Sequence, residues 1–118
     1  ALKKAKSNCK VVAVEPSSSP ILSKGIKGSH NVEGVGLGFV PNIYNEKLVD
    51  NVISIDEALA RKTCKDLAKK EGIFCGTSSG MNVAAAIEIS KELGPKSKVV
   101  TVACDTGLKY LSEGLFDD

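Results

Sequence analysis

Three short apolar runs alternate with stretches of helical periodicity, and this alternation limits the folds open to the chain. The runs cover residues 9–15, 50–55 and 98–104, and the helical stretches run to about residue 71 and from about 79 to 93. Short apolar runs bounded by breakers such as Pro16 are typical of buried parallel strands. Strands that alternate with helices predict an α/β fold with a mainly parallel sheet.

The two long helices differ in the way their apolar residues are placed. The first is expected to begin with a capping box, because Glu57 follows Ser54 by three residues. Its apolar face is expected to comprise Leu59, Thr63, Cys64, Leu67 and Ala68. The second helix is apolar on nearly all sides from Met81 to Ile89, which predicts that it is buried.

Composition and charge exclude several classes of protein. A chain of 118 residues with 42% hydrophobic and 25% charged residues fits one soluble domain or part of one. The net charge of +2, with one lysine cluster within residues 3–10, is too small to predict nucleic-acid binding. No run of 18 apolar residues occurs, so no membrane span is expected. Because the chain opens on Ala1 rather than Met, we expect it to be an excerpt.

The four cysteines predict reduced, buried thiols in a cytosolic protein rather than a metal centre. Cys9, Cys64, Cys75 and Cys104 lie far apart and form no C-x-x-C pair. A zinc site would need all four, or three together with His30, from unrelated segments. We therefore expect no metal.

The turn Gly76–Gly80 follows a short apolar segment and opens the second helix. Its sequence fits the G-x-S-x-G pattern of α/β-hydrolases. That family needs an acid and a histidine after the serine, whereas the single histidine, His30, precedes Ser78, so chain order excludes a hydrolase. A serine pair at a helix start can also act simply as an N-cap, and this alternative stays open.

A second glycine cluster, Gly34–Gly38, lies within a long irregular loop predicted for residues 25–41. It follows no strand and runs into Pro41 rather than a helix, so it does not predict a dinucleotide site. Its glycines would let the backbone approach a small ligand, although a plain flexible loop explains the spacing equally well. His30 is interpreted as a loop side chain hydrogen-bonded to backbone rather than as a catalytic base.

Taken in order, these motifs resemble the C-terminal half of the cysteine synthase (O-acetylserine sulfhydrylase) family. The matching stretches are Val11–Pro16, Gly34–Pro41, Glu71–Ile73 leading into Gly76–Gly80, and Gly107 with Tyr110–Ser112 and Leu115–Phe116. The resemblance covers essentially the whole chain. It implies a three-layer α/β/α architecture within a fold type II (tryptophan synthase β-like) domain, of which residues 1–118 form the partial C-terminal, cofactor-binding part of a longer enzyme.

The resemblance also implies a site for pyridoxal 5'-phosphate. Ser78 would hydrogen-bond the pyridine nitrogen, Gly76 and Thr77 would share that wall, and Gly34 and Gly36 would lie at the substrate. A hydroxyl group is too weak an acid to protonate a pyridine, and the partial positive charge of a helix N-terminus disfavours a pyridinium. A neutral ring suits loss of acetate from O-acetylserine followed by addition of sulfide to give cysteine.

Other family features match no motif in this chain. They include the Schiff-base lysine and the phosphate-binding loop, so we expect no catalytic residue here and no activity from residues 1–118 alone. The family further implies a cytoplasmic homodimer, with serine acetyltransferase as a possible partner. Glu33, where glutamine is common, and Cys104, where proline is common, leave a cystathionine β-synthase-like or cysteine desulfhydrase enzyme open as alternatives. A non-catalytic fragment and a binding module are two further alternatives.

Overall fold

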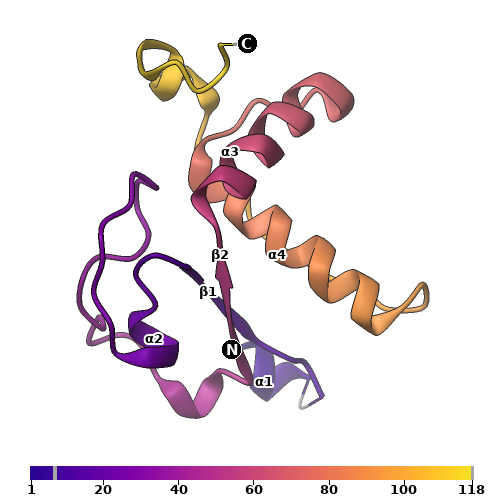
Figure 1. Ribbon diagram of the computed structural model, residues 1–118. Coiled ribbons are helices and arrows are strands. Elements are labelled where there is room, and N and C mark those ends of the chain that lie inside the picture. Colours follow the sequence, from indigo (N-terminus) through magenta and orange to yellow (C-terminus); the bar gives the residue numbers. More distant parts are fainter. Residues whose placement is uncertain (7, 118) are drawn as a thin grey trace.

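Two parallel strands lie between two layers of helix and loop in the computed structural model, which describes residues 1–6 and 8–117 (Figure 1). The strands are β1 (Val12–Pro16) and β2 (Asn51–Ile55), and the register places Val12 beside Asn51 and Pro16 beside Ile55. The longer helices are α3 (Glu57–Asp66) and α4 (Thr77–Leu93). The predicted α/β class with a parallel sheet is confirmed.

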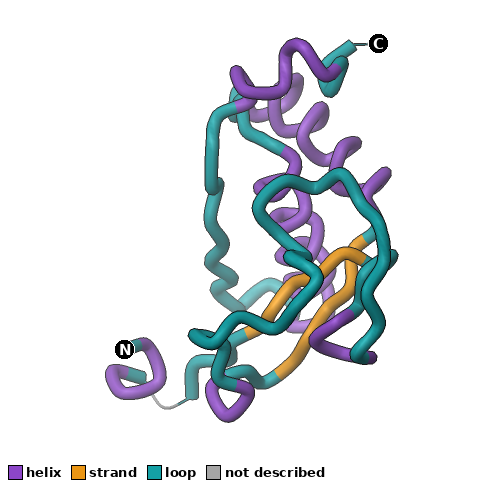
Figure 2. Tube along the Cα trace, turned by 90° about the vertical axis from the view of Figure 1, so that its left-hand side faces the viewer, coloured by secondary structure: helices purple, strands orange, loops and turns teal. Residues whose placement is uncertain are grey.

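The remaining elements are short. They are the α-helical turns α1 (Leu2–Ala5) and α2 (Ile21–Lys24), the 3-10 turns η1 (Glu46–Leu48) and η3 (Gly107–Glu113), and the π-helical turn η2 (Leu67–Glu71). Between α2 and η1 the described chain forms a long loop without helix or strand, as predicted. This loop and α2 lie on one side of the strands, and α3 and α4 lie on the other (Figure 2).

The start of α3 differs from the predicted capping box. Asp56 is the N-cap, and its Oδ1 accepts hydrogen bonds from the backbone N–H groups of Ala58 at 2.8 Å and Leu59 at 3.3 Å. Ser54 instead lies within β2, and its hydroxyl group donates to Glu15 across the strand pair at 3.0 Å. The capping-box prediction was wrong because Asp56, directly before the first helical residue, is the nearer acceptor for the free N–H groups.

Helices α3 and α4 bury narrower faces than the sequence predicts. On α3 the buried residues are Ala60, Thr63 and Cys64, whereas Leu59 is 39% exposed. On α4 residues 77–81 are buried, as are Ala84 and Ala85, but Val83 is half-buried and Ile87 is 45% exposed, so the prediction of burial on all sides was wrong. An all-round apolar pattern shows that a helix can be buried on every side, whereas actual burial depends on which elements surround it.

Residues 98–104 do not form the predicted third strand. The segment lies beside α4, where Asn82 Nδ2 donates to the backbone oxygen of Val102 at 3.0 Å. Val100 is 91% exposed and Val102 is 63% exposed. A strand exists only when its backbone pairs with another strand, and none of the described residues pairs with this segment, so an apolar run alone was insufficient evidence.

A buried carboxylate joins the strands to α2. Glu15 is 3% exposed and accepts hydrogen bonds from the Leu22 backbone N–H at 2.7 Å, from the Ser54 hydroxyl group at 3.0 Å and from the Ser23 hydroxyl group. Three donors offset the loss of water around the charge. The contacts hold the chain that leaves β1 close to the end of the sheet, where the candidate site lies.

Candidate functional site

Ser78 lies in the first turn of α4 and is buried. The residue is 6% exposed, and its hydroxyl group forms no hydrogen bond with any other described residue. Gly76 occupies the N-cap, and no side chain caps this helix. The alternative in which the serine pair is merely an N-cap is therefore wrong, and the Ser78 hydroxyl group is left available to a ligand.

Ser79, the other member of the pair, has an internal role. It is fully buried, and its Oγ accepts a hydrogen bond from the Cys104 backbone N–H at 2.9 Å. This bond joins the first turn of α4 to the segment that leads into Asp105. The two adjacent serines thus differ in function, because one supports the fold and one presents a free hydroxyl group.

Two glycines of the turn are required by close packing. A Cβ atom on Gly76 would lie 2.3 Å from Asp105 Oδ1 and 2.4 Å from Tyr110 Cε2. A Cβ atom on Gly80 would lie 2.2 Å from the backbone oxygen of Ala60, where α4 crosses α3. Neither glycine has a positive φ, so the space around them, rather than their backbone conformation, explains the residue type.

Asp105 and Tyr110 form a buried pair behind Gly76 that the sequence reasoning missed. The Tyr110 hydroxyl group donates to Asp105 Oδ2 at 2.7 Å. Burial, together with the hydrogen bond to Asp105, raises the pKa of Tyr110 above its usual range, so its hydroxyl group stays protonated and donates. Asp105 Oδ1 is buried without a hydrogen-bond partner among the described residues, and it lies at the positive end of α4.

The glycine loop lies over the carboxyl end of β1. His30 Nε2 is 2.9 Å from the backbone oxygen of Gly36, and His30 Nδ1 accepts from the Val32 backbone N–H at 3.2 Å. The interpretation of His30 as a side chain bonded to loop backbone is confirmed. Gly36 has φ of +55°, and a Cβ atom there would lie 2.8 Å from Pro16 Cγ, whereas a Cβ on Gly34 would meet nothing within 4 Å.

The fold brings the loop and the start of α4 to the same end of the sheet. Val32 is buried in one apolar cluster with Ile55 of β2 and Met81 of α4. An ion-pair contact also joins the two segments, because Lys109 Nζ lies 3.6 Å from Glu33 Oε2 in the loop and 3.6 Å from Asp105 Oδ2. Asp105 itself packs against Gly76. Ligands of parallel sheets bind beyond the carboxyl ends of the strands, which is where these segments meet.

The cysteines are all free thiols, but only two are buried. Cys64 and Cys75 are buried, whereas Cys9 is half-buried and Cys104 is exposed, so the prediction of four buried thiols was wrong for the last two. Burial raises the pKa of Cys64 to about 12, so this thiol stays protonated. Its Sγ donates to the backbone oxygen of Gly76 at 3.0 Å. In the described part of the chain, no three potential metal ligands lie close enough to hold an ion.

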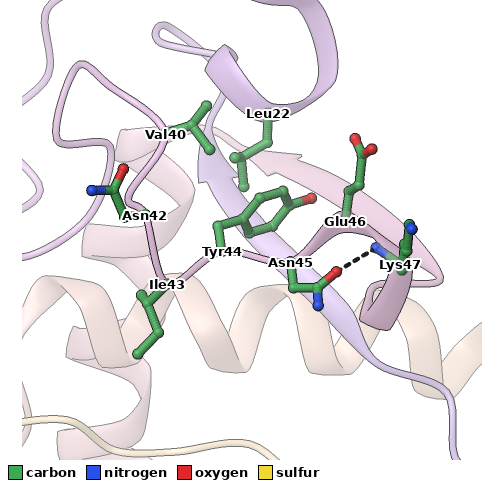
Figure 3. Close-up of a pocket in the computed structure, with 8 residues that line it drawn as sticks. All are labelled: Leu22, Val40, Asn42, Ile43, Tyr44, Asn45, Glu46 and Lys47. Atoms are coloured by element: carbon green, nitrogen blue, oxygen red, sulfur yellow. Dashed lines mark hydrogen bonds between the residues drawn. The ribbon is translucent and has the colours of Figure 1, made fainter.

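A surface hollow of about 600 Å³ lies away from these residues, between α2 and η1 (Figure 3). Its lining residues are Leu22, Val40, Asn42, Ile43, Tyr44, Asn45, Glu46 and Lys47. None of the site residues expected from the sequence lines it. Within residues 1–6 and 8–117, no helix combines the length and the apolar character needed to cross a membrane.

Comparison with known proteins identifies the family. A family model described as pyridoxal-phosphate dependent enzyme matches residues 1–105. The chain belongs to this family. It is 44% identical to a cysteine synthase of Staphylococcus aureus strain Mu50 over 119 residues, which cover 99% of this chain. The chain spans 38% of the length of that relative.

Two solved structures show the same similarity. A cysteine synthase from Entamoeba histolytica matches with a TM-score of 0.91 and 35% identity, covering 99% of this chain and 35% of that one. An O-acetylserine dependent cystathionine beta-synthase from Helicobacter pylori matches with a TM-score of 0.90 and 33% identity, covering 98% of this chain and 37% of that one. At these identities, the resemblance inferred from the motifs is confirmed.

Proposed function

We propose that this chain is the C-terminal part of a cysteine synthase that makes cysteine from O-acetylserine and sulfide with pyridoxal 5'-phosphate. Residues 1–118 would form part of its cofactor-binding domain, and the full-length protein is called the parent enzyme below. Membership of the pyridoxal-phosphate dependent family and the 44% identity to a cysteine synthase support this reaction. The cystathionine β-synthase-like and desulfhydrase alternatives are not favoured, because the Staphylococcus aureus relative is a cysteine synthase.

The free Ser78 hydroxyl group is the observation that carries the cofactor assignment. A pyridine nitrogen is an acceptor that needs one donor, and Ser78 has a hydroxyl group without a partner in the described chain. Ser78 also lies in the first turn of α4, whose partial positive charge disfavours a second positive charge on a ring nitrogen. These residues fit a neutral pyridine ring.

The roles of the other residues rest on the family resemblance. Gly76 and Thr77 would complete the wall beside the ring, and Gly34 and Gly36 would lie on the substrate side. When bound, pyridoxal phosphate supplies the electron sink that lets the β-substituent of the amino acid leave and be replaced. This chain's part is to hold the ring nitrogen unprotonated and to shape the space above it.

Ser78→Ala in the parent enzyme tests this assignment. Loss of one hydrogen bond is expected to shift the absorbance band of the bound cofactor and to lower the rate of cysteine formation about fivefold to tenfold. Ser90→Ala is the matched control, because Ser90 lies on the same helix and its hydroxyl group donates to the Ala86 backbone oxygen at 2.7 Å. A Ser78→Ala enzyme with the wild-type spectrum and rate would remove Ser78 from the cofactor site.

The assembly and location of the parent are also part of the proposal. We propose a cytoplasmic homodimer with serine acetyltransferase as a protein partner, on the strength of the family resemblance. Gel filtration of the parent, alone and mixed with serine acetyltransferase, tests the homodimer and the partner. A monomer that elutes unchanged in the mixture would contradict them.

A further inference from the structure

We propose that His30 is a positioning residue, whose imidazole ring holds the Gly34–Gly38 turn in the shape that the substrate side of the site requires. This inference rests on the proposed function, in which Gly34 and Gly36 lie at the substrate. It concerns a side chain that touches loop backbone rather than the reacting atoms. The expected consequence of losing it is therefore weaker substrate binding, not loss of the chemical step.

Both ring nitrogens of His30 are used by the loop. The Val32 backbone N–H can only donate, so Nδ1, 3.2 Å away, accepts. The Gly36 backbone oxygen can only accept, so Nε2, 2.9 Å away, donates. The two contacts therefore select the neutral ring with its proton on Nε2, and together they link two parts of the loop that are four residues apart.

One end of this link is fixed to the core. Val32 is 2% exposed and packs with Ile55 and Met81. The preceding residue, Asn31, donates its backbone N–H to Glu57 Oε2 of α3 at 2.8 Å. Because His30 directly precedes these anchored residues, the position of its backbone is fixed.

The other end of the link is the glycine turn. A Cβ atom on Gly36 would lie 2.4 Å from His30 Nε2 and 2.8 Å from Pro16 Cγ, so the turn is pressed between the ring and the last residue of β1. Beyond Gly36 the loop is open to solvent, with Leu37 57% and Phe39 61% exposed. The His30 bond therefore restrains the start of an exposed segment, and a restrained segment loses less conformational entropy when a ligand binds to it.

Two substitutions in the parent enzyme separate the two bonds. His30→Gln places an amide donor close to the position of Nε2, and His30→Asn places an amide oxygen close to that of Nδ1. The bond to Gly36 should survive in the first variant and be lost in the second. Asn45→Ala is the matched control, because it removes another hydrogen bond between a side chain and the backbone, in which the Lys47 N–H donates to Asn45 Oδ1 at 3.1 Å.

We expect His30→Asn to raise KM for O-acetylserine about fivefold, the factor for one ordinary hydrogen bond, with kcat within about twofold of wild type. His30→Gln and Asn45→Ala should keep the wild-type KM. Backbone order parameters from NMR relaxation at residues 34–38 should be lower in His30→Asn than in wild type and unchanged in His30→Gln, because only the first variant leaves the Gly36 oxygen without its donor. The inference is overturned if His30→Asn has the wild-type KM and order parameters, or if the two variants raise KM and lower the order parameters to the same degree.

The order parameters keep this inference separate from the proposed function. If the wild-type parent forms no cysteine, the functional proposal fails, whereas lower order parameters at residues 34–38 in His30→Asn and not in His30→Gln would still establish the link to Gly36. If the parent is active and the order parameters do not distinguish the two variants, the proposal for His30 fails alone. A His30→Asn protein that does not fold, beside a folded His30→Gln protein with lower order parameters at residues 34–38, would also refute it.

Discussion

The crossing of α3 and α4 at Gly80 makes a quantitative prediction for Gly80→Ala. Gly80 has no positive φ, so alanine can adopt its backbone conformation. Without neighbours, alanine would stabilise the helix by about 0.5 to 1 kcal/mol relative to glycine. The neighbours reverse the sign, because the new Cβ would lie 2.2 Å from the Ala60 backbone oxygen and 2.6 Å from Cys64 Sγ.

The magnitude follows from which atoms obstruct the methyl group. Overpacking in a core costs about 1 to 3 kcal/mol, and the upper end applies here because a helical backbone oxygen cannot rotate away as a side chain can. After the helical gain is subtracted, we expect a net loss of about 2 kcal/mol in the free energy of unfolding. This corresponds to a roughly 30-fold smaller ratio of folded to unfolded protein.

Urea unfolding followed by circular dichroism measures this loss as a lower midpoint at unchanged slope. Gly72→Ala is a control for backbone conformation alone, because Gly72 has φ of +68° and open space where a Cβ atom would lie. Its expected loss is about 1 kcal/mol, from the left-handed conformation. A Gly80→Ala protein as stable as wild type would refute the close approach of the two helices.

Two further predictions concern buried and paired carboxylates. Glu15→Gln should lower the free energy of unfolding by about 2 kcal/mol, because an amide group cannot accept from all the donors that surround this carboxylate, and an unchanged urea midpoint would contradict its role. The pKa of Glu57 lies below its usual range, chiefly through the hydrogen bond from the Asn31 N–H. The stabilisation that this carboxylate gives the folded state is therefore present above its unfolded-state pKa and is lost as pH falls through its folded-state pKa. Melting temperature measured against pH should therefore fall on the acid side in wild type and more gently in Glu57→Gln; identical curves would count against the Asn31 contact.

Local sequence patterns predicted the positions of the two strands and of the start of α4. The apolar runs ending at Pro16 and Ile55 became β1 and β2, and the turn at Gly76 opened α4 as expected. The apolar run at residues 98–104 did not become a strand. Strand formation depends on a partner strand, and the apolar run alone does not show whether one is present.

The candidate site was predictable to a similar extent. The family resemblance singles out Ser78 within the turn, but the different roles of Ser78 and Ser79 depend on a contact between Ser79 and Cys104, 25 residues later. The Asp105–Tyr110 pair left no signal in the sequence, since a buried carboxylate and its donor look like ordinary polar residues until the fold encloses them.

The bond from Ser54 to Glu15 has a consequence for synthesis of the chain. Ser54 follows Glu15 by 39 residues, and β2 is the parallel partner of β1. At roughly 5 to 20 residues per second, a ribosome needs about 2 to 8 s to add that length. During this interval β1 lacks β2 beside it, and the Glu15 carboxylate lacks the Ser54 hydroxyl group as a donor. The sheet end that carries the glycine loop can therefore form only after β2 has been translated, whatever the intrinsic folding rate of the chain.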